Sequence, residues 1–120
     1  MATVATILIG LVAVLHIGFF VLESLLWTSP TGRKVFGMSR EQAQHTAVLA
    51  KNQGVYNLFL AAGLIWSIVL GAAPHAHAIA LFFLVCVIVA AVVGALTANP
   101  RILIVQGVPA IAALAVTLLA

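Results

Sequence analysis

Long apolar runs separated by short polar stretches make up this chain. The runs predict four helical spans, at residues 3–27, 46–70, 79–98 and 102–120. Each run has about the 20 residues that an α-helix needs to cross the hydrocarbon core of a bilayer. The connections between the runs are short, which favours antiparallel packing of consecutive helices. The pattern therefore predicts an all-α fold, a four-helix transmembrane bundle in which residues 1–120 form a single integral membrane domain.

The polar stretches contain signals that delimit the helices. Residues 28–32 read Thr-Ser-Pro-Thr-Gly, which predicts a turn after the first span. Ser39 and Gln42 have the spacing of a capping box, in which each side chain bonds the backbone of the other residue. The second helix is therefore expected to begin directly after Ser39, outside the bilayer and ahead of its membrane part.

Composition supports a membrane protein. The chain is 65% hydrophobic and only 6% charged, whereas soluble domains carry charge on about a quarter of their residues. The formal charge of +3 is not gathered into a basic patch, so no nucleic-acid partner is expected. Cys86 is the single cysteine, which excludes an intramolecular disulfide.

The basic residues predict an orientation. Arg33, Lys34 and Arg40 lie in the first connection, and Arg101 lies in the third. The second connection and the N-terminal flank contain neither lysine nor arginine. By the positive-inside rule, the first and third connections face the cytoplasm, and both termini lie on the non-cytoplasmic side of the cell inner membrane.

Polar residues within the apolar spans mark a candidate ligand site. Glu23 lies four residues before Trp27, about 6 Å below the cytoplasmic interface at 1.5 Å per residue. The second helix carries the string Asn52-Gln53-Gly54-Val55-Tyr56-Asn57 at a similar depth. We expect Glu23 to lie within hydrogen-bond reach of this string. The expected ligand-binding residues are Glu23, Trp27, Asn52, Gln53, Tyr56, Asn57 and Gln106.

Gln106 joins this set from the fourth span. It lies five residues after Arg101, about 7.5 Å along the helix by the same rise. Gly107 and Pro109 are expected to bend the helix just beyond it, because proline removes a backbone hydrogen bond and clashes with the preceding turn.

Glu23 and His16 are the candidate catalytic residues. They are seven positions apart, which places them on one face of an uninterrupted α-helix. Structural roles are the alternative: Glu23 as a protonated acid in one interhelical bond, and His16 as a buried side chain bonded to a carbonyl. The amides of the second helix can likewise serve as interhelical contacts worth about 0.6 kcal/mol each.

Histidine ligation is a further alternative. His16 or His45 could hold a haem, although no motif requires one and the cofactor stays unknown. His75 and His77 have the spacing of a metal-binding pair, but without further ligands nearby no metal site is predicted.

Two motifs carry a resemblance. Glu23, Trp27, Pro30 and Gly32 form the pattern E-x-x-x-W-x-x-P-x-G, and residues 52–57 form N-Q-G-x-Y-N. With these motifs, the chain resembles a family of small four-helix bacterial integral membrane proteins of unknown function. The resemblance implies four spans and a role for Glu23, Trp27 and the polar string, and it implies no activity.

Three functions remain open. The first is binding of a small lipophilic or amphipathic molecule at the polar site, with proton-coupled transport as its extension. Four spans with one acid in the first also describe the small multidrug-resistance exporters, a likeness of architecture alone. The second is a membrane-embedded enzyme that uses Glu23 and His16 in acid–base chemistry. The third is a structural or assembly subunit. The expected partners are membrane lipid, the small ligand and, as an open alternative, further copies of the chain in a homo-oligomer.

Overall fold

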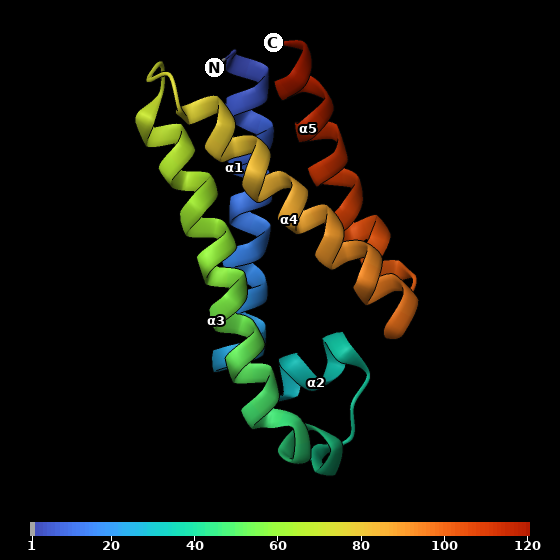
Figure 1. Ribbon diagram of the computed structural model, residues 1–120. Helices are drawn as coiled ribbons and strands as arrows, with labels where there is room; N and C mark the ends of the chain where they lie inside the picture. The colour runs from blue at the N-terminus through green and yellow to red at the C-terminus, as the bar shows by residue number, and fades with distance from the viewer. Residues whose placement is uncertain (1) are drawn as a thin grey trace. The chain divides into compact units, whose positions relative to one another are not determined.

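The computed structural model describes residues 2–120, and the regular elements in this range are all helical (Figure 1). Two π-helical segments, η1 and η2, interrupt the α-helices. The elements in chain order are α1 Thr3–Phe20, η1 Val21–Leu25, α2 Pro30–Phe36, α3 Arg40–Leu70, α4 Ala76–Thr97, η2 Leu103–Gly107 and α5 Val108–Leu119. The predicted all-α class is confirmed.

Three stretches of the described chain are long and apolar enough to cross a membrane: Thr3–Leu25, Arg40–Leu70 and Ala76–Thr97. They make the chain a multi-pass membrane protein. The fourth apolar stretch, Leu103–Leu119, is shorter than these three. That this stretch also crosses the membrane stays a prediction, and so does the four-span bundle that depends on it.

The helix boundaries differ from the predicted spans by a few residues at several points. The first span ends at Leu25 rather than at residue 27, because Leu26 leaves helical geometry with φ −115° and ψ 6°. The third begins at Ala76 instead of residue 79 and ends at Thr97. The fourth apolar stretch, Leu103–Leu119, begins with the π segment η2 and continues as α5.

The chain folds into two compact units. The first contains the residues up to Leu15 together with Leu60–Ala120, and the second is His16–Phe59. In the first unit, α4 packs along η2 and α5 (Figure 1). Its core consists of small and branched aliphatic residues: Ile9, Val12, Ala13, Leu64, Ala80, Leu84, Val87, Ala110 and Ala113.

Small residues let the helices of this first unit approach closely. A Cβ on Gly63 would overlap the ring of Phe83, and one on Gly107 would lie 3.3 Å from Cβ of Ala91. Without a hydrophobic driving force between helices in lipid, such close packing is a main source of helix association. The apolar helices are therefore joined through contacts that depend on small side chains.

The second unit contains a helix where a turn was predicted. Residues 30–36 form α2, because the same residues that suggested a turn also cap a helix. The Ser29 hydroxyl accepts from the Gly32 amide at 3.1 Å, Pro30 occupies the first turn, and Gly37 ends the helix with φ 63°. Proline at the start and left-handed glycine just past the end are typical of a helix.

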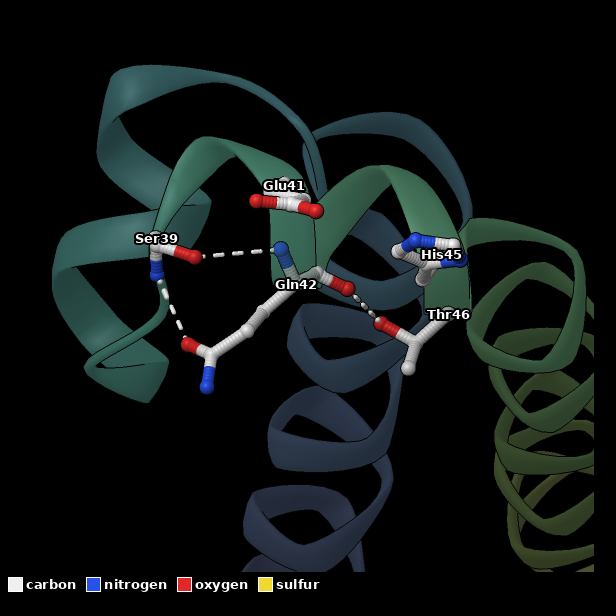
Figure 2. Close-up of a pocket in the computed structure, with 5 residues that line it drawn as sticks. All are labelled: Ser39, Glu41, Gln42, His45 and Thr46. Carbon is white, nitrogen blue, oxygen red and sulfur yellow. Dashed lines mark hydrogen bonds between the residues drawn. The ribbon is translucent and has the colours of Figure 1, made fainter.

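The predicted capping box at the start of α3 is confirmed. The Gln42 amide N–H donates to Ser39 Oγ at 3.1 Å, and the Ser39 N–H donates to Gln42 Oε1 at 2.9 Å (Figure 2). These two bonds satisfy backbone donors that a helix N-terminus otherwise leaves unpaired. The helix therefore begins at Arg40, as expected from the sequence.

Candidate functional site

Glu23 lies in the middle of η1, where the first span widens from α- to π-geometry before it ends. The Leu26 N–H donates to the Val21 carbonyl at 3.0 Å, five residues back instead of four. Single π turns within α-helices occur frequently at functional sites. The turn contains no glycine or proline, so its own sequence does not require the distortion.

Asn57 bonds the carboxyl group of Glu23. Its Nδ2 donates to Glu23 Oε1 at 2.5 Å, and both side chains are half-buried. The expectation that Glu23 reaches the polar string of the second helix is confirmed. The donor is a neutral amide on α3, 34 residues along the chain from the acceptor.

Ser24 and Gly54 bring the two helices together beside this bond. Ser24 Oγ donates to the Lys51 carbonyl at 2.8 Å. Gly54 is buried against Ser24, and a Cβ at Gly54 would overlap the serine hydroxyl and lie 3.0 Å from its backbone nitrogen. Glycine is therefore required at this position for η1 to lie directly on α3.

Trp27 extends the same antiparallel pairing. Its indole Nε1 donates to Thr46 Oγ1 at 2.9 Å, and its ring packs against Phe36 with 4.8 Å between centroids. The three contacts show that the two segments run antiparallel: residue 23 meets residue 57, residue 24 meets residue 51, and residue 27 meets residue 46. Trp27 lies in the turn after the span and is held by the beginning of α3.

The other residues of the predicted site are placed differently. Asn52 and Gln53 are exposed on α3. Tyr56 is 53% exposed and packs edge to face on Phe59, with 6.0 Å between ring centroids. Gln106 is half-buried within η2, which belongs to the first compact unit. Of the amides and the phenol of α3 in the expected set, Asn57 alone is bonded to Glu23 among the described residues.

His16 is fully buried and packs edge to face on Phe19, with 5.1 Å between ring centroids. The shared face with Glu23 was expected for an uninterrupted α-helix. Because η1 begins at Val21, the last part of the interval between the two residues follows a wider turn, so the angle between them differs from that in an uninterrupted α-helix.

A hollow at the start of α3 is lined by polar side chains (Figure 2). Its residues are Ser39, Glu41, Gln42, His45 and Thr46. Ser39 and Gln42 form the capping box, and the Thr46 hydroxyl donates to the Gln42 carbonyl at 2.8 Å. These groups complete a helix end, so we do not assign the hollow to a ligand. Across residues 2–120, no three His, Cys, Asp or Glu side chains are grouped as metal ligands.

Sequence reasoning missed the contribution of Ser24 and the structural role of Gly54. One signal was available, because Gly54 is the only glycine within the polar string of residues 52–57. Glycine in such a position often marks close approach of another backbone. Nothing in the sequence indicated that its partner is Ser24.

The comparisons with known proteins place the chain in a family. Residues 10–118 match the family described as "Protein of unknown function (DUF1304)". The "Uncharacterized protein YpaA" of Lactococcus lactis subsp. lactis (strain IL1403) is 36% identical over 115 residues, which cover 93% of this chain and 95% of that protein. No solved structure matches the chain. The chain therefore belongs to the DUF1304 family of proteins of unknown function.

Proposed function

We propose that this protein binds a small lipophilic or amphipathic molecule at the Glu23–Asn57 pair, within the inner membrane. The observation that carries the proposal is the incomplete pairing of the carboxyl group. Oε1 accepts a bond from Asn57, while within its compact unit, His16–Phe59, no other side-chain donor is bonded to the carboxyl group. Glu23 is half-buried rather than fully enclosed, so its carboxyl group is within reach of a small molecule.

The chemistry of this pair suggests a class of ligand. A carboxyl group in an apolar helix is costly and is rarely retained without a function. Buried polar groups with a purely structural role are usually fully hydrogen-bonded. An amphiphile whose polar end carries an N–H donor would complete the pairing, while its apolar part would lie among lipid-facing side chains. Long-chain alkylamines are the simplest members of this class.

Burial of His16 favours binding over acid–base catalysis. A catalytic acid or base must come within hydrogen-bond reach of the group that gains or loses a proton. His16 is fully enclosed and packs on Phe19, whereas Glu23 is only half-buried. The accessible carboxyl group is thus better suited to hold a ligand than to work in concert with His16.

The binding proposal is tested by quenching of Trp27 fluorescence. Trp66→Phe leaves Trp27 as the single tryptophan, since the chain has two. The protein in neutral-lipid nanodiscs is titrated with brominated dodecylamine and, for comparison, with brominated dodecanoate. Quenching of Trp27 fluorescence should saturate at a lower concentration of the amine than of the carboxylate. The Glu23→Gln substitution should weaken binding of the amine about tenfold, which is the effect of losing a charged hydrogen bond worth about 1.4 kcal/mol.

Glu41→Gln is the matched control. Glu41 is the other acid of the chain and lies exposed in the first turn of α3. Its substitution changes net charge by the same amount and should leave amine quenching within about twofold of wild type, as expected for an exposed surface charge. Equal quenching by amine and carboxylate, or equal losses in both variants, would contradict the proposal.

The proposed membrane topology has four spans with both termini outside the cytoplasm. It is supported by the basic residues of the first and third connections. The stretch Leu103–Leu119 must then cross the bilayer, although it is shorter than the other spans. Reporter fusions after Leu70 and after Ala120 test this arrangement. A cytoplasmic reporter at Ala120 would overturn it.

A further inference from the structure

The connection between the first span and α3 combines exposed apolar side chains with cations. In α2, Val35 is 57% exposed, Phe36 is 42% exposed, and Lys34 is exposed between Arg33 and these two residues. The helix has seven residues, so these two side chains make a large part of its surface apolar. In water such a surface is unfavourable, whereas at a bilayer interface it lies against acyl chains.

The cations of this connection outnumber its acids. Arg33 and Lys34 lie in the last turn of α2, and Arg40 is the first residue of α3. Glu41 is the one acid between residues 28 and 45. Three of the five basic residues of the chain are therefore gathered within eight positions, beside the aromatic pair of Trp27 and Phe36.

Arg33 has an unsatisfied donor. Its Nε is buried and has no hydrogen-bond acceptor among residues 2–120. Buried polar groups are nearly always bonded in native proteins, and each exception calls for a specific explanation. The Arg33 side chain as a whole is only half-buried. A guanidinium presents its donors as a planar fork that matches phosphate oxygens, so a phosphate is a suitable acceptor for the accessible donors of this side chain.

We propose that α2 is an interfacial helix that binds the phosphate of an anionic phospholipid through Arg33, Lys34 and Arg40. Val35 and Phe36 enter the acyl-chain boundary, and the cations reach the headgroup level. Trp27, held by Thr46 at 2.9 Å, stays at this level with Phe36 packed on it. Interfacial tryptophan and neighbouring lysine or arginine are a common combination at the cytoplasmic surface of membrane proteins.

Charge complementarity selects a lipid over a soluble partner. The connection follows η1, where a membrane-spanning stretch ends, and α3 returns toward the bilayer after it. Its exposed apolar side chains and its cations therefore lie where acyl chains meet phosphates. The proposal is independent of ligand binding at Glu23, because the phosphate is bound by Arg33, Lys34 and Arg40 and not by the Glu23–Asn57 pair.

Native mass spectrometry of the full-length protein tests the proposal. The delipidated protein is titrated with phosphatidylglycerol and with phosphatidylcholine of identical acyl chains. Wild type should prefer phosphatidylglycerol at least tenfold, because each lysine or arginine near an anionic lipid surface contributes about fivefold, or about 1 kcal/mol. The double variant Arg33→Gln/Lys34→Gln should lose about 25-fold in phosphatidylglycerol affinity by the same increments.

Arg101→Gln is the matched control. Arg101 is a single exposed cation two residues before η2, and its loss should change phosphatidylglycerol affinity by less than about twofold. Arg33→Lys keeps the charge but removes the planar fork of donors. Its affinity for phosphatidylglycerol should lie between those of wild type and the double variant. The variants Val35→Ser and Phe36→Ser should weaken binding of both lipids equally, because they remove apolar contact alone.

Salt supplies a test that needs no variant. In bilayers, raising salt from 0.1 M to 1 M shortens the Debye length from about 10 Å to about 3 Å and should abolish the preference for the anionic lipid. Equal affinity for the two lipids, or an equal loss in Arg101→Gln, would overturn the proposal. Full competition by millimolar inorganic phosphate would overturn it too, because the site would then be a soluble-anion site.

Discussion

The two π segments differ in what produces them. Two residues after η2 comes Pro109, which has no N–H to donate to the carbonyl of Val105 and clashes with the preceding turn. The Val108 N–H donates to Leu103 instead, five residues back. The distortion of η2 therefore has a local cause that can be read in the sequence.

The π geometry of η1 has no such cause. Its sequence, Val-Leu-Glu-Ser-Leu, contains no helix breaker. What distinguishes it is contact with α3: Asn57 bonds Glu23, Ser24 bonds the Lys51 carbonyl, and Gly54 admits Ser24 at close range. The comparison indicates that η2 is determined by its own residues, whereas η1 is stabilised by residues about 30 positions away. The candidate site belongs to the second type.

The largest effect is expected from Gly54→Ala. The new Cβ would displace Ser24, break its bond to Lys51 and press on its backbone nitrogen. Overpacking of this kind costs about 1–3 kcal/mol. The free energy of unfolding in mixed detergent micelles measures the loss.

Gly18→Ala is the matched control for this change. Gly18 also lies in a helix of the second unit, and a Cβ there meets no atom within 4 Å. Alanine at this position should stabilise the protein by up to about 1 kcal/mol, since it is the better helix former. Adding Ser24→Ala to Gly54→Ala should recover part of the loss. If Gly54→Ala were as stable as wild type, the close contact would not support η1.

A smaller effect is expected from the Glu23–Asn57 bond. A double-mutant cycle with Glu23→Ala and Asn57→Ala should give a coupling free energy of about 0.6–1.7 kcal/mol, the range for polar contacts between membrane helices. The same cycle with Asn52→Ala, an exposed amide on the same helix, should give a coupling near zero. Equal coupling in the two cycles would remove the distinction between Asn57 and the other amides.

The smallest change in stability is expected from Pro109→Ala, which tests the local cause of η2. The free energy of unfolding should change by less than about 1 kcal/mol, because proline near the first turn of a helix is well tolerated. The conformation of Leu103–Gly107 should nevertheless change to an α-turn, as measured by backbone chemical shifts. Val21→Ala, in η1, should leave its own π turn intact. Persistence of the π turn at η2 without Pro109 would indicate a tertiary cause there as well.

The sequence by itself determined the helical class, the apolar stretches and several boundaries. Spans of apolar residues must form helices in a bilayer, because each backbone group needs an internal hydrogen bond. The capping box of Ser39 and Gln42 uses side chains only three residues apart, so its geometry follows from local sequence. The bend expected just after Gln106 from Gly107 and Pro109 stays a prediction, although the π segment Leu103–Gly107 ends directly before Val108 and Pro109.

Tertiary structure decided the composition of the site. The polar string of residues 52–57 offers amides on several sides of α3, and helical spacing alone does not choose among them. The choice of Asn57 depends on where η1 touches α3, which is set by the absence of a side chain at Gly54 and the hydroxyl of Ser24. The expectation that His16 and Glu23 share a face also assumed a uniform α-helical repeat between them. The π turn that invalidates this assumption has no signal in its own five residues, because its stabilising contacts come from another helix.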